Sequence, residues 1–342
     1  MDIKQALHRI VAHGHLSQTE MQQVMRQVMT GECTDAQIGA LLTGLRMKGE
    51  TIEEITGAAQ IMRELVTPVA VNAPNLVDTC GTGGSGQKLF NVSTASAFVV
   101  AAAGAQVAKH GNRAVSSSFG SADLLEAAGV DLTVSPDVVA RAIESIGVGF
   151  IFAPSHHSAM RHAIGPRKEL GLRTIFNMLG PLTNPASVKR QVIGVFSPEL
   201  CLPFAQVLKN LGSEHVMVVH SQDGLDEFSL AAPTFVAELK DGEVTTQTIN
   251  PEDFGLAMQG HVGLNPTDVA GSLALIKEVF SSASTEVSAR AADLIALNAG
   301  AAIYVSGVAT SFAAGVEMAE DAISSGAAAQ KLQAFVDFTQ SA

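Results

Sequence analysis

The chain has 342 residues, of which 47% are hydrophobic and only 16% are charged, so it is long and apolar enough to fold around a large core. Its net charge of −12 argues against nucleic-acid binding over the whole surface, and a composition without Trp and with a single Tyr argues against base-stacking platforms. Three scattered cysteines predict reduced thiols, with neither a disulfide framework nor a zinc site.

Residues 1–70 predict a helical region. Ser17, Thr34 and Thr51 each begin a capping-box pattern, with Glu or Gln three residues later. The N-terminus carries polar residues where a signal peptide would carry an apolar run. The longest apolar run, 97–105, is too short to span a membrane, so we expect a cytoplasmic protein without membrane contact.

A linker at 68–74 precedes a predicted α/β domain over 75–342. Short apolar runs alternate there with helical stretches, which is typical of a mostly parallel sheet. These runs are 76–77, 106–108, 149–152, 192–196 and 216–219. A β-hairpin is predicted over 234–248, and Ala-rich helices are predicted from 285 to the end.

Charge is spread unevenly along this domain. Residues 79–198 contain ten bases and six acids, a net charge of +4, so the remainder carries −16. No acid occurs in 79–122. A segment without acids inside an acidic protein suits a bound polyanion, although a buried Ala-rich core segment would also exclude charge.

A glycine-rich segment, 78–86, follows the first predicted strand. Its glycines would let backbone amides approach a ligand closely, and the helix predicted from Val92 adds hydroxyls and a positive dipole end. We interpret it as a phosphate or pyrophosphate cradle. It also matches the dinucleotide fingerprint, but the acid expected about 20 residues later is missing, since the next acid is Asp123. A structural glycine turn is the alternative.

Two further polar segments follow later strands. Lys109–Arg113, with the Ser-rich stretch 116–121, offers cations, an amide and hydroxyls at a strand end, where open α/β sheets bind ligands. A solvated loop is the alternative. His156 and His157 are adjacent and have no nearby Glu, so they do not fit a zinc site and predict a pocket wall or packed histidines.

Arg167 and the pair Asp226-Glu227 complete the candidate groups. Arg167 offers a guanidinium fork suited to a carboxylate, with a surface charge at a helix end as the alternative. Asp226 and Glu227 follow a predicted strand and suit Mg²⁺, which takes one or two carboxylates plus substrate phosphates. An ordinary acidic turn is the alternative.

Together and in order, these segments resemble the anthranilate phosphoribosyltransferase family over nearly the whole chain. The resemblance rests on 78–86, 91–94, 109–113, 153–157, 173–185 and 223–227. It implies the nucleoside-phosphorylase-like phosphoribosyltransferase fold, with a small all-helical N-terminal domain and a large α/β domain around a mostly parallel central sheet. The helical domain would be 1–70, completed by helices from about 160–190. Residues 75–342 would bind phosphoribosyl pyrophosphate.

The implied enzyme transfers the phosphoribosyl group of 5-phosphoribosyl 1-pyrophosphate to the amino group of anthranilate. The products are N-(5-phosphoribosyl)anthranilate and pyrophosphate, in the second step of tryptophan synthesis from chorismate. The resemblance also implies a homodimer joined through the helical domain, two Mg²⁺ ions per subunit and an active site at the hinge. No general base is assigned, because the amine of anthranilate is already a nucleophile.

The resemblance carries over residue by residue. Phosphoribosyl pyrophosphate would be bound by Gly81, Gly84, Ser85, Asn91, Ser93, Thr94, Lys109, Ser117 and Ser121. Anthranilate would be bound or approached by Gly81, Asn112, Arg167, His110, His157 and Pro181. Mg²⁺ would be met by Ser93, Asp226 and Glu227. Two positions depart from the family pattern: Ser85 stands where an Asp is common, and Leu89 where Ser or Thr is frequent.

Three alternatives remain open from the sequence. A pyrimidine-nucleoside-phosphorylase-like enzyme would share the glycine loop and the lysine, but phosphorolysis needs no metal on pyrophosphate, so Asp226-Glu227 argues against it. A related transferase could use another aromatic acceptor. A non-catalytic nucleic-acid-binding homologue is opposed by the charge of −16 outside 79–198.

Overall fold

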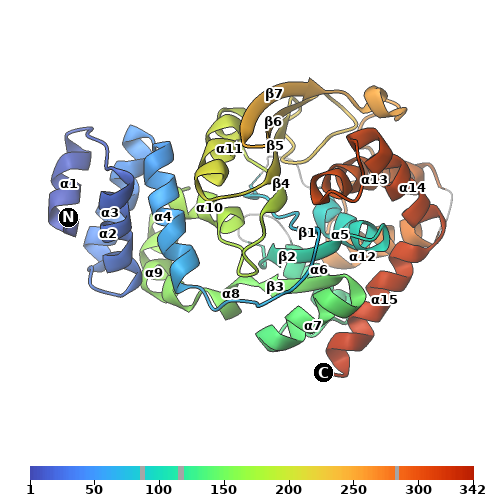
Figure 1. Ribbon diagram of the computed structural model, residues 1–342, viewed down its shortest axis with the longest axis horizontal. Helices are drawn as coiled ribbons and strands as arrows, with labels where there is room; N and C mark the ends of the chain where they lie inside the picture. Colours follow the sequence, from blue (N-terminus) through green and yellow to red (C-terminus); the bar gives the residue numbers. More distant parts are fainter. Residues whose placement is uncertain (85–88, 115–118, 282–284) are drawn as a thin grey trace.

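The computed structural model describes residues 1–84, 89–114, 119–281 and 285–342. Figure 1 shows an N-terminal helical bundle beside a larger part that holds the strands, with the N-terminus on the bundle and the C-terminus at the lower edge of the larger part. The bundle consists of α1 (Ile3–Val11), α2 (Gln18–Met29), α3 (Asp35–Lys48) and α4 (Ile52–Leu65). Two later helices, α9 (Arg161–Leu170) and α10 (Ile175–Leu179), pack against it.

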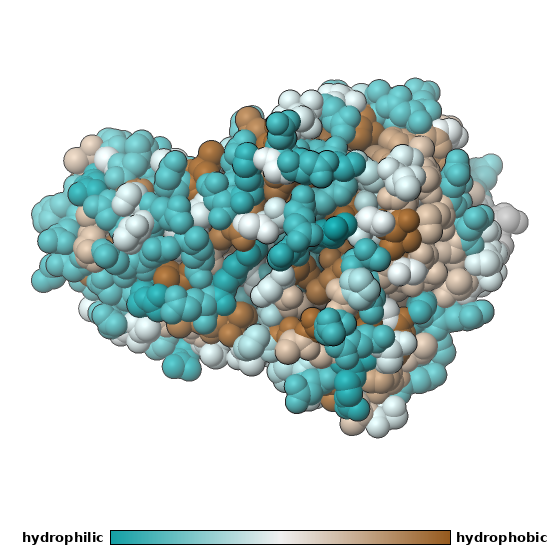
Figure 2. Space-filling model, in the orientation of Figure 1, coloured by the Kyte–Doolittle hydropathy of each residue, from teal (hydrophilic) through white to brown (hydrophobic). Residues whose placement is uncertain are grey.

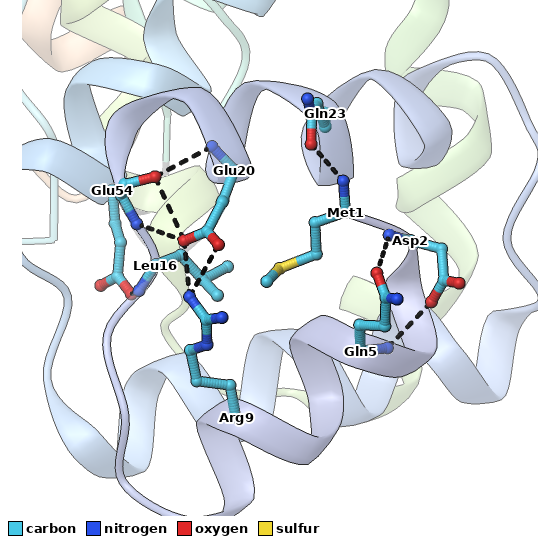
Figure 3. A network of polar contacts seen from close by, with 9 residues as sticks. Met1, Asp2, Gln5, Arg9, Leu16, Glu20, Gln23 and Glu54 are labelled. Carbon is cyan, nitrogen blue, oxygen red and sulfur yellow. Dashed lines mark hydrogen bonds and ion pairs between the residues drawn. The ribbon is translucent and has the colours of Figure 1, made fainter.

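The predicted capping boxes are present at the starts of α2, α3 and α4, and Asp2 forms a fourth with Gln5 at the start of α1 (Figure 3). Each such cap contributes about 1 kcal/mol to helix stability. A fully buried ion pair joins Lys48 to Glu54 at 2.6 Å, and Glu54 also accepts the N–H of Leu16 at 2.9 Å. The bundle therefore has its own polar framework around an apolar interior.

Two sheets form the larger part. The first is wholly parallel and contains β1 (Leu76–Val77), β2 (Gln106–Gly111) and β3 (Val148–Phe152). The second contains β4 (Arg190–Gly194), β5 (His215–Ser221), β6 (Thr234–Lys240) and β7 (Glu243–Ile249). Strands β4 and β5 are parallel, whereas β6 and β7 form the predicted antiparallel hairpin. The expected α/β class with an N-terminal helical bundle is confirmed.

Helices cover these sheets. They are α5 (Val92–Ala102), α6 (Ser121–Ala128), α7 (Pro136–Ile146), α8 (Ala153–His156), α11 (Cys201–Asn210), α12 (Val269–Phe280), α13 (Glu286–Ser306), α14 (Phe312–Ser324) and α15 (Ala327–Gln340). Short 3₁₀ turns occupy Ser158–Met160, Gly180–Leu182, Pro198–Leu200 and Pro251–Phe254. Helix α13 is largely buried, because its small side chains let α5 and α14 pack closely against it. Within the described ranges, no helix has both the length and the apolarity that a membrane span requires.

The bundle and the larger part share one apolar cluster, which extends from α1–α4 through α10 and α11 to one face of β5. Two connections also cross between them: Thr67 donates its N–H to the His156 carbonyl at 2.9 Å, and the His156 ring contacts the Thr67 carbonyl at 2.9 Å. In Figure 2 hydrophilic side chains cover most of the visible bundle, and more apolar side chains appear over the larger part.

Candidate active site

Asp78 lies where the two sheets meet, directly after β1. Its carboxylate is fully buried and accepts hydrogen bonds from the His110 N–H (3.1 Å) and from Asn184 Nδ2 (2.8 Å). Burial raises the pKa of Asp78 to about 6, against the opposing effect of the nearby Lys109 charge. Asp78 therefore ties the ends of neighbouring strands together, which positions the loops that follow them.

The glycine loop begins after this anchor and lies against the end of β4. Thr82 donates its N–H to the Gly194 carbonyl at 2.8 Å, and a Cβ on Gly81 would come within 2.9 Å of that same oxygen. Gly83 and Gly84 have φ values of +66° and +83°, which favour glycine. The first half of the loop therefore packs closely against β4, and the approach of its backbone amides to a ligand stays a prediction.

Lys109 brings a buried positive charge to the same place. It lies on β2 and is only 3% exposed; its Nζ lies 3.1 Å from the Thr79 carbonyl oxygen and 3.4 Å from the Ser93 hydroxyl. In the described part of the chain, no carboxylate lies within 4 Å of this ammonium group. A buried cation held only by neutral oxygens provides a favourable position for an anionic ligand.

The N-terminal end of α5 faces this cation. The Asn91 side chain accepts a hydrogen bond from Ser272 at 2.9 Å, so α12 fixes its orientation. Thr94 has a buried hydroxyl with no hydrogen-bond partner among the described residues. Ser93 donates its N–H to the Glu227 carboxylate at 3.1 Å. Backbone amides and hydroxyls at a helix N-terminus form a typical phosphate-binding arrangement.

Asp226 and Glu227 lie in the loop after β5, which passes very close to β4. A Cβ on Gly194 would lie 1.5 Å from the Asp226 carbonyl oxygen, so only glycine permits this approach. Burial, and then the adjacent Asp226 charge, raise the pKa of Glu227 to about 8. Two crowded carboxylates of this kind fit Mg²⁺, which needs few protein ligands when substrate phosphates complete its shell.

A Mg²⁺ ion at this position would need substrate oxygens as further ligands. Over the described ranges, no group of three or more His, Cys, Asp or Glu side chains could hold a metal ion unaided. The pair Asp226-Glu227, with the Ser93 hydroxyl nearby on α5, supplies only part of an octahedral shell. A metal at this position would therefore bind together with an oxygen-rich ligand.

His110 and His157 face each other on the other side of Asp78. Their Nε2 atoms are 3.3 Å apart, and the His110 Nδ1 lies 3.2 Å from the Gly180 carbonyl. Burial lowers the pKa of His110 to about 3 and that of His157 to about 4, so both rings are neutral at pH 7. The carbonyl requires the His110 proton on Nδ1, which leaves His157 to donate through Nε2. Pro181 follows Gly180 and is buried.

Arg167 lies on α9, the helix that packs against the bundle. Its guanidinium carbon is 5.1 Å from the centre of the Phe176 ring, and burial lowers its pKa. Its guanidinium forms no ion pair or hydrogen bond with any described residue. A desolvated guanidinium on an aromatic face is well suited to a planar carboxylate.

In the segment after β2, only one of the two cations that the sequence offers at this strand end is without a carboxylate partner among the described residues. Arg113 pairs with Glu126 at 2.7 Å and with Asp123 at 3.1 Å, so its charge is already neutralised. Asn112 accepts the Arg113 N–H through its side chain, and the Ser121 hydroxyl donates to the Asn112 carbonyl at 3.3 Å. These contacts order the turn before α6 and leave Lys109 as the buried cation of this segment.

Sequence reasoning missed several residues that build the site. Asn184 donates a hydrogen bond to Asp78. Gly194 leaves room for the acidic loop, which carries Asp226 and Glu227. Arg173 donates to the Gly84 carbonyl, and its guanidinium lies 4.6 Å from the centre of the Phe196 ring. Asn184 and Arg173 lie in the segment 173–185 that carries the resemblance, but no spacing in the sequence indicates their contacts with Asp78 and Gly84, which are distant in the chain. Two predicted residues, Ser85 and Ser117, lie outside the described residues.

Comparison with known proteins places this geometry in a family. Residues 73–329 match the α/β domain of a glycosyl transferase family, and residues 4–66 match the helical bundle domain of the same family. An anthranilate phosphoribosyltransferase of Teredinibacter turnerae is 66% identical over 99% of both chains.

Solved structures agree with this match. The anthranilate phosphoribosyltransferase of Thermus thermophilus is 41% identical, with a TM-score of 0.92 over 98% of this chain and 99% of that one. The Saccharomyces cerevisiae enzyme, solved in complex with PRPP and Mg, is 28% identical, with a TM-score of 0.90 over 99% of this chain and 98% of that one. The chain therefore belongs to the anthranilate phosphoribosyltransferase family.

Proposed function

We propose that the loops around Lys109 bind 5-phosphoribosyl 1-pyrophosphate and that Arg167 holds anthranilate beside it. The reaction is that of the family: the phosphoribosyl group moves to the amino group of anthranilate, and pyrophosphate leaves, in the second step of tryptophan synthesis from chorismate. One observation carries the residue assignment: the Ser93 turn of α5 contacts both a buried ammonium group and a partly buried carboxylate.

The pyrophosphate end of the substrate would lie on the N-terminal end of α5. We assign to it Gly81, Gly84, Ser85, Asn91, Ser93, Thr94, Lys109, Ser117 and Ser121. The desolvated Lys109 and the unpaired Thr94 hydroxyl support this assignment most directly. Preorganised donors of this kind stabilise the charge that develops on the departing pyrophosphate.

We assign two Mg²⁺ ions per subunit, near Asp226, Glu227 and the Ser93 hydroxyl. When bound, Mg²⁺ neutralises pyrophosphate oxygens and so helps the leaving group depart. Glu227, whose pKa is raised to about 8, would give up its proton when the cation binds. The Saccharomyces cerevisiae relative, solved in complex with PRPP and Mg, supports the metal.

Anthranilate would lie between the bundle and the larger part. We assign to it Gly81, Asn112, Arg167, His110, His157 and Pro181. Arg167 would hold the carboxylate, while the two neutral histidines form an uncharged wall beside the ring. The amine nitrogen forms a bond to the ribose C1 as the bond to pyrophosphate breaks. Its proton leaves to pyrophosphate or water, so no general base is required.

The larger organisation is also a proposal. We divide the chain into a helical domain over 1–70, completed by helices from about 160–190, and a domain over 75–342 that binds phosphoribosyl pyrophosphate. The active site lies at the hinge between them. The helical domain would join two subunits in a homodimer, and the enzyme would act in the cytoplasm on small molecules, without nucleic-acid or membrane partners. Size-exclusion chromatography with light scattering tests the dimer.

The decisive experiment follows the loss of anthranilate fluorescence with purified protein, phosphoribosyl pyrophosphate and Mg²⁺. We expect turnover that requires all three and releases one pyrophosphate per anthranilate. A control reaction with a pyrimidine nucleoside and inorganic phosphate should give no free base. Turnover in that control, without turnover of anthranilate, would reject the assignment in favour of a phosphorylase.

A further inference from the structure

The segment 259–264 contacts both halves of the proposed pyrophosphate site, although none of its residues was assigned to that site. On one side, Gln259 donates its N–H to the Leu230 carbonyl at 2.8 Å, just beyond the acidic loop. On the other side, the Leu264 carbonyl accepts the N–H of Phe90 at 3.0 Å, just before α5. The segment therefore bridges the acidic loop and the start of α5.

His261 lies in the middle of this bridge and contacts Ser229, two residues beyond Glu227. The Ser229 hydroxyl lies 2.7 Å from an Asp223 carboxylate oxygen, accepts the Ala231 N–H at 2.9 Å, and lies 3.1 Å from His261 Nε2. A hydroxyl has one proton, and the Ser229 hydroxyl donates it to Asp223. His261 Nε2 must therefore donate to Ser229.

His261 contacts Ser229 at one end of the acidic loop, and Ser229 in turn contacts Asp223 at the other end. Asp223 accepts the Ser229 hydroxyl with one carboxylate oxygen and the Leu225 N–H with the other, at 3.1 Å. The loop between Asp223 and Ser229 is thus closed by side-chain contacts that His261 completes. The His261 side chain is only 8% exposed, so water does not readily replace its N–H.

We propose that His261 is a positioning residue for the reaction: through Ser229 it holds Asp226 and Glu227 in place against α5. The inference rests on the proposed function, because it takes these two carboxylates as the Mg²⁺ ligands. His261 contacts neither of them, so it acts on their placement and not on their chemistry. Partners that orient metal ligands typically change metal affinity by 10- to 100-fold when they are removed.

The test compares His261→Ala with His261→Gln in the full chain. The alanine variant should raise the KM for phosphoribosyl pyrophosphate, and the Mg²⁺ concentration needed for half-maximal rate, by roughly 10-fold, with an unchanged KM for anthranilate. The glutamine variant keeps an N–H donor at a similar reach and should recover most of this loss. Equal loss for both substrates, or no recovery with glutamine, would overturn the proposal.

A matched control is His215→Ala, which removes a buried histidine from the opposite end of β5. It should lower the melting temperature and leave both KM values unchanged. A second readout is calorimetric binding of phosphoribosyl pyrophosphate with Mg²⁺ in the absence of anthranilate, where His261→Ala should bind roughly 10-fold more weakly than wild type. If wild type does not bind, the proposed function fails. If wild type and His261→Ala bind equally, only the role of His261 fails.

Discussion

The two ends of the second sheet differ in whether their charged side chains have partners within the protein. At the end away from the candidate site, His215 pairs with Glu238 at 2.8 Å, and Lys240 donates to the Tyr304 hydroxyl at 3.0 Å. Arg190 donates to the Ser306 carbonyl at 2.8 Å. Arg190, His215, Lys240 and Tyr304 line a surface hollow of about 630 Å³, in which Arg190 and His215 already have the carboxylates of Glu214 and Glu238 as partners. A hollow of this kind offers little for a charged ligand to satisfy.

At the site end, Lys109 acts on Asp78 and Glu227 only at longer range, since neither carboxylate contacts it directly among the described residues. Within the described residues, Lys109 and Arg167 have no carboxylate within 4 Å, while Glu227 lies beside Asp226. Buried charges without a direct partner lower the stability of the protein when no ligand is bound. A ligand that supplies the opposite charges restores this stability. Charged side chains without a carboxylate partner among the described residues, more than concavity, therefore mark the candidate site end of this sheet.

The largest effect is expected from removing both site carboxylates. Asp226→Asn with Glu227→Gln should lower Mg²⁺-dependent turnover by roughly a thousandfold or more, because the leaving group loses its metal. Steady-state kinetics over a Mg²⁺ series measures this. The control Glu238→Gln, at the other end of the sheet, should lower the melting temperature and keep turnover. Wild-type activity in the double variant would refute the metal assignment.

A backbone clash provides the second test. In Gly194→Ala the new Cβ would lie 1.5 Å from the Asp226 carbonyl oxygen, so the acidic loop must move. We expect affinity for phosphoribosyl pyrophosphate to fall by about 100-fold or more, in line with a displaced set of catalytic groups. Calorimetry measures it. Gly39→Ala, whose Cβ would meet nothing within 4 Å, should leave affinity unchanged and stabilise α3 by about 1 kcal/mol.

Arg167→Ala should act on the other substrate. Losing charged hydrogen bonds of about 1.5–3 kcal/mol should raise the KM for anthranilate by roughly 10- to 100-fold and leave that for phosphoribosyl pyrophosphate nearly unchanged. Fluorescence kinetics separates the two constants. Arg190→Ala, from the end where the arginine already has partners, should change neither. An unchanged anthranilate KM in Arg167→Ala would remove this residue from the site.

The smallest effect concerns pH and stability. Burial raises the pKa of Glu227 to about 8, so the folded state holds this proton more tightly than the unfolded chain does. The resulting stabilisation is complete below about pH 4.5 and is lost as pH rises toward 8. Urea unfolding without Mg²⁺ should therefore show wild type losing stability relative to Glu227→Gln between pH 5 and 8. A constant difference would mean that Glu227 is not perturbed.

The sequence by itself determined the local elements and the family. Capping patterns at Ser17, Thr34 and Thr51 predicted three helix starts, and apolar alternation predicted the strands and the hairpin. These signals depend on residues a few positions apart, so they can be recognised without the fold. The ordered motifs were also sufficient for the family, because each is a contiguous segment that can be read without the fold.

Only the folded structure shows which of two similar arginines has no carboxylate partner among the described residues. Arg113 and Arg167 are equally plausible anion partners in the sequence, yet Arg113 is neutralised by Glu126 and Arg167 rests on Phe176. Likewise, nothing in the sequence links Gly194 to the acidic loop. The physical reason is that burial and pairing depend on side chains brought together from distant parts of the chain, and no local pattern encodes those distances.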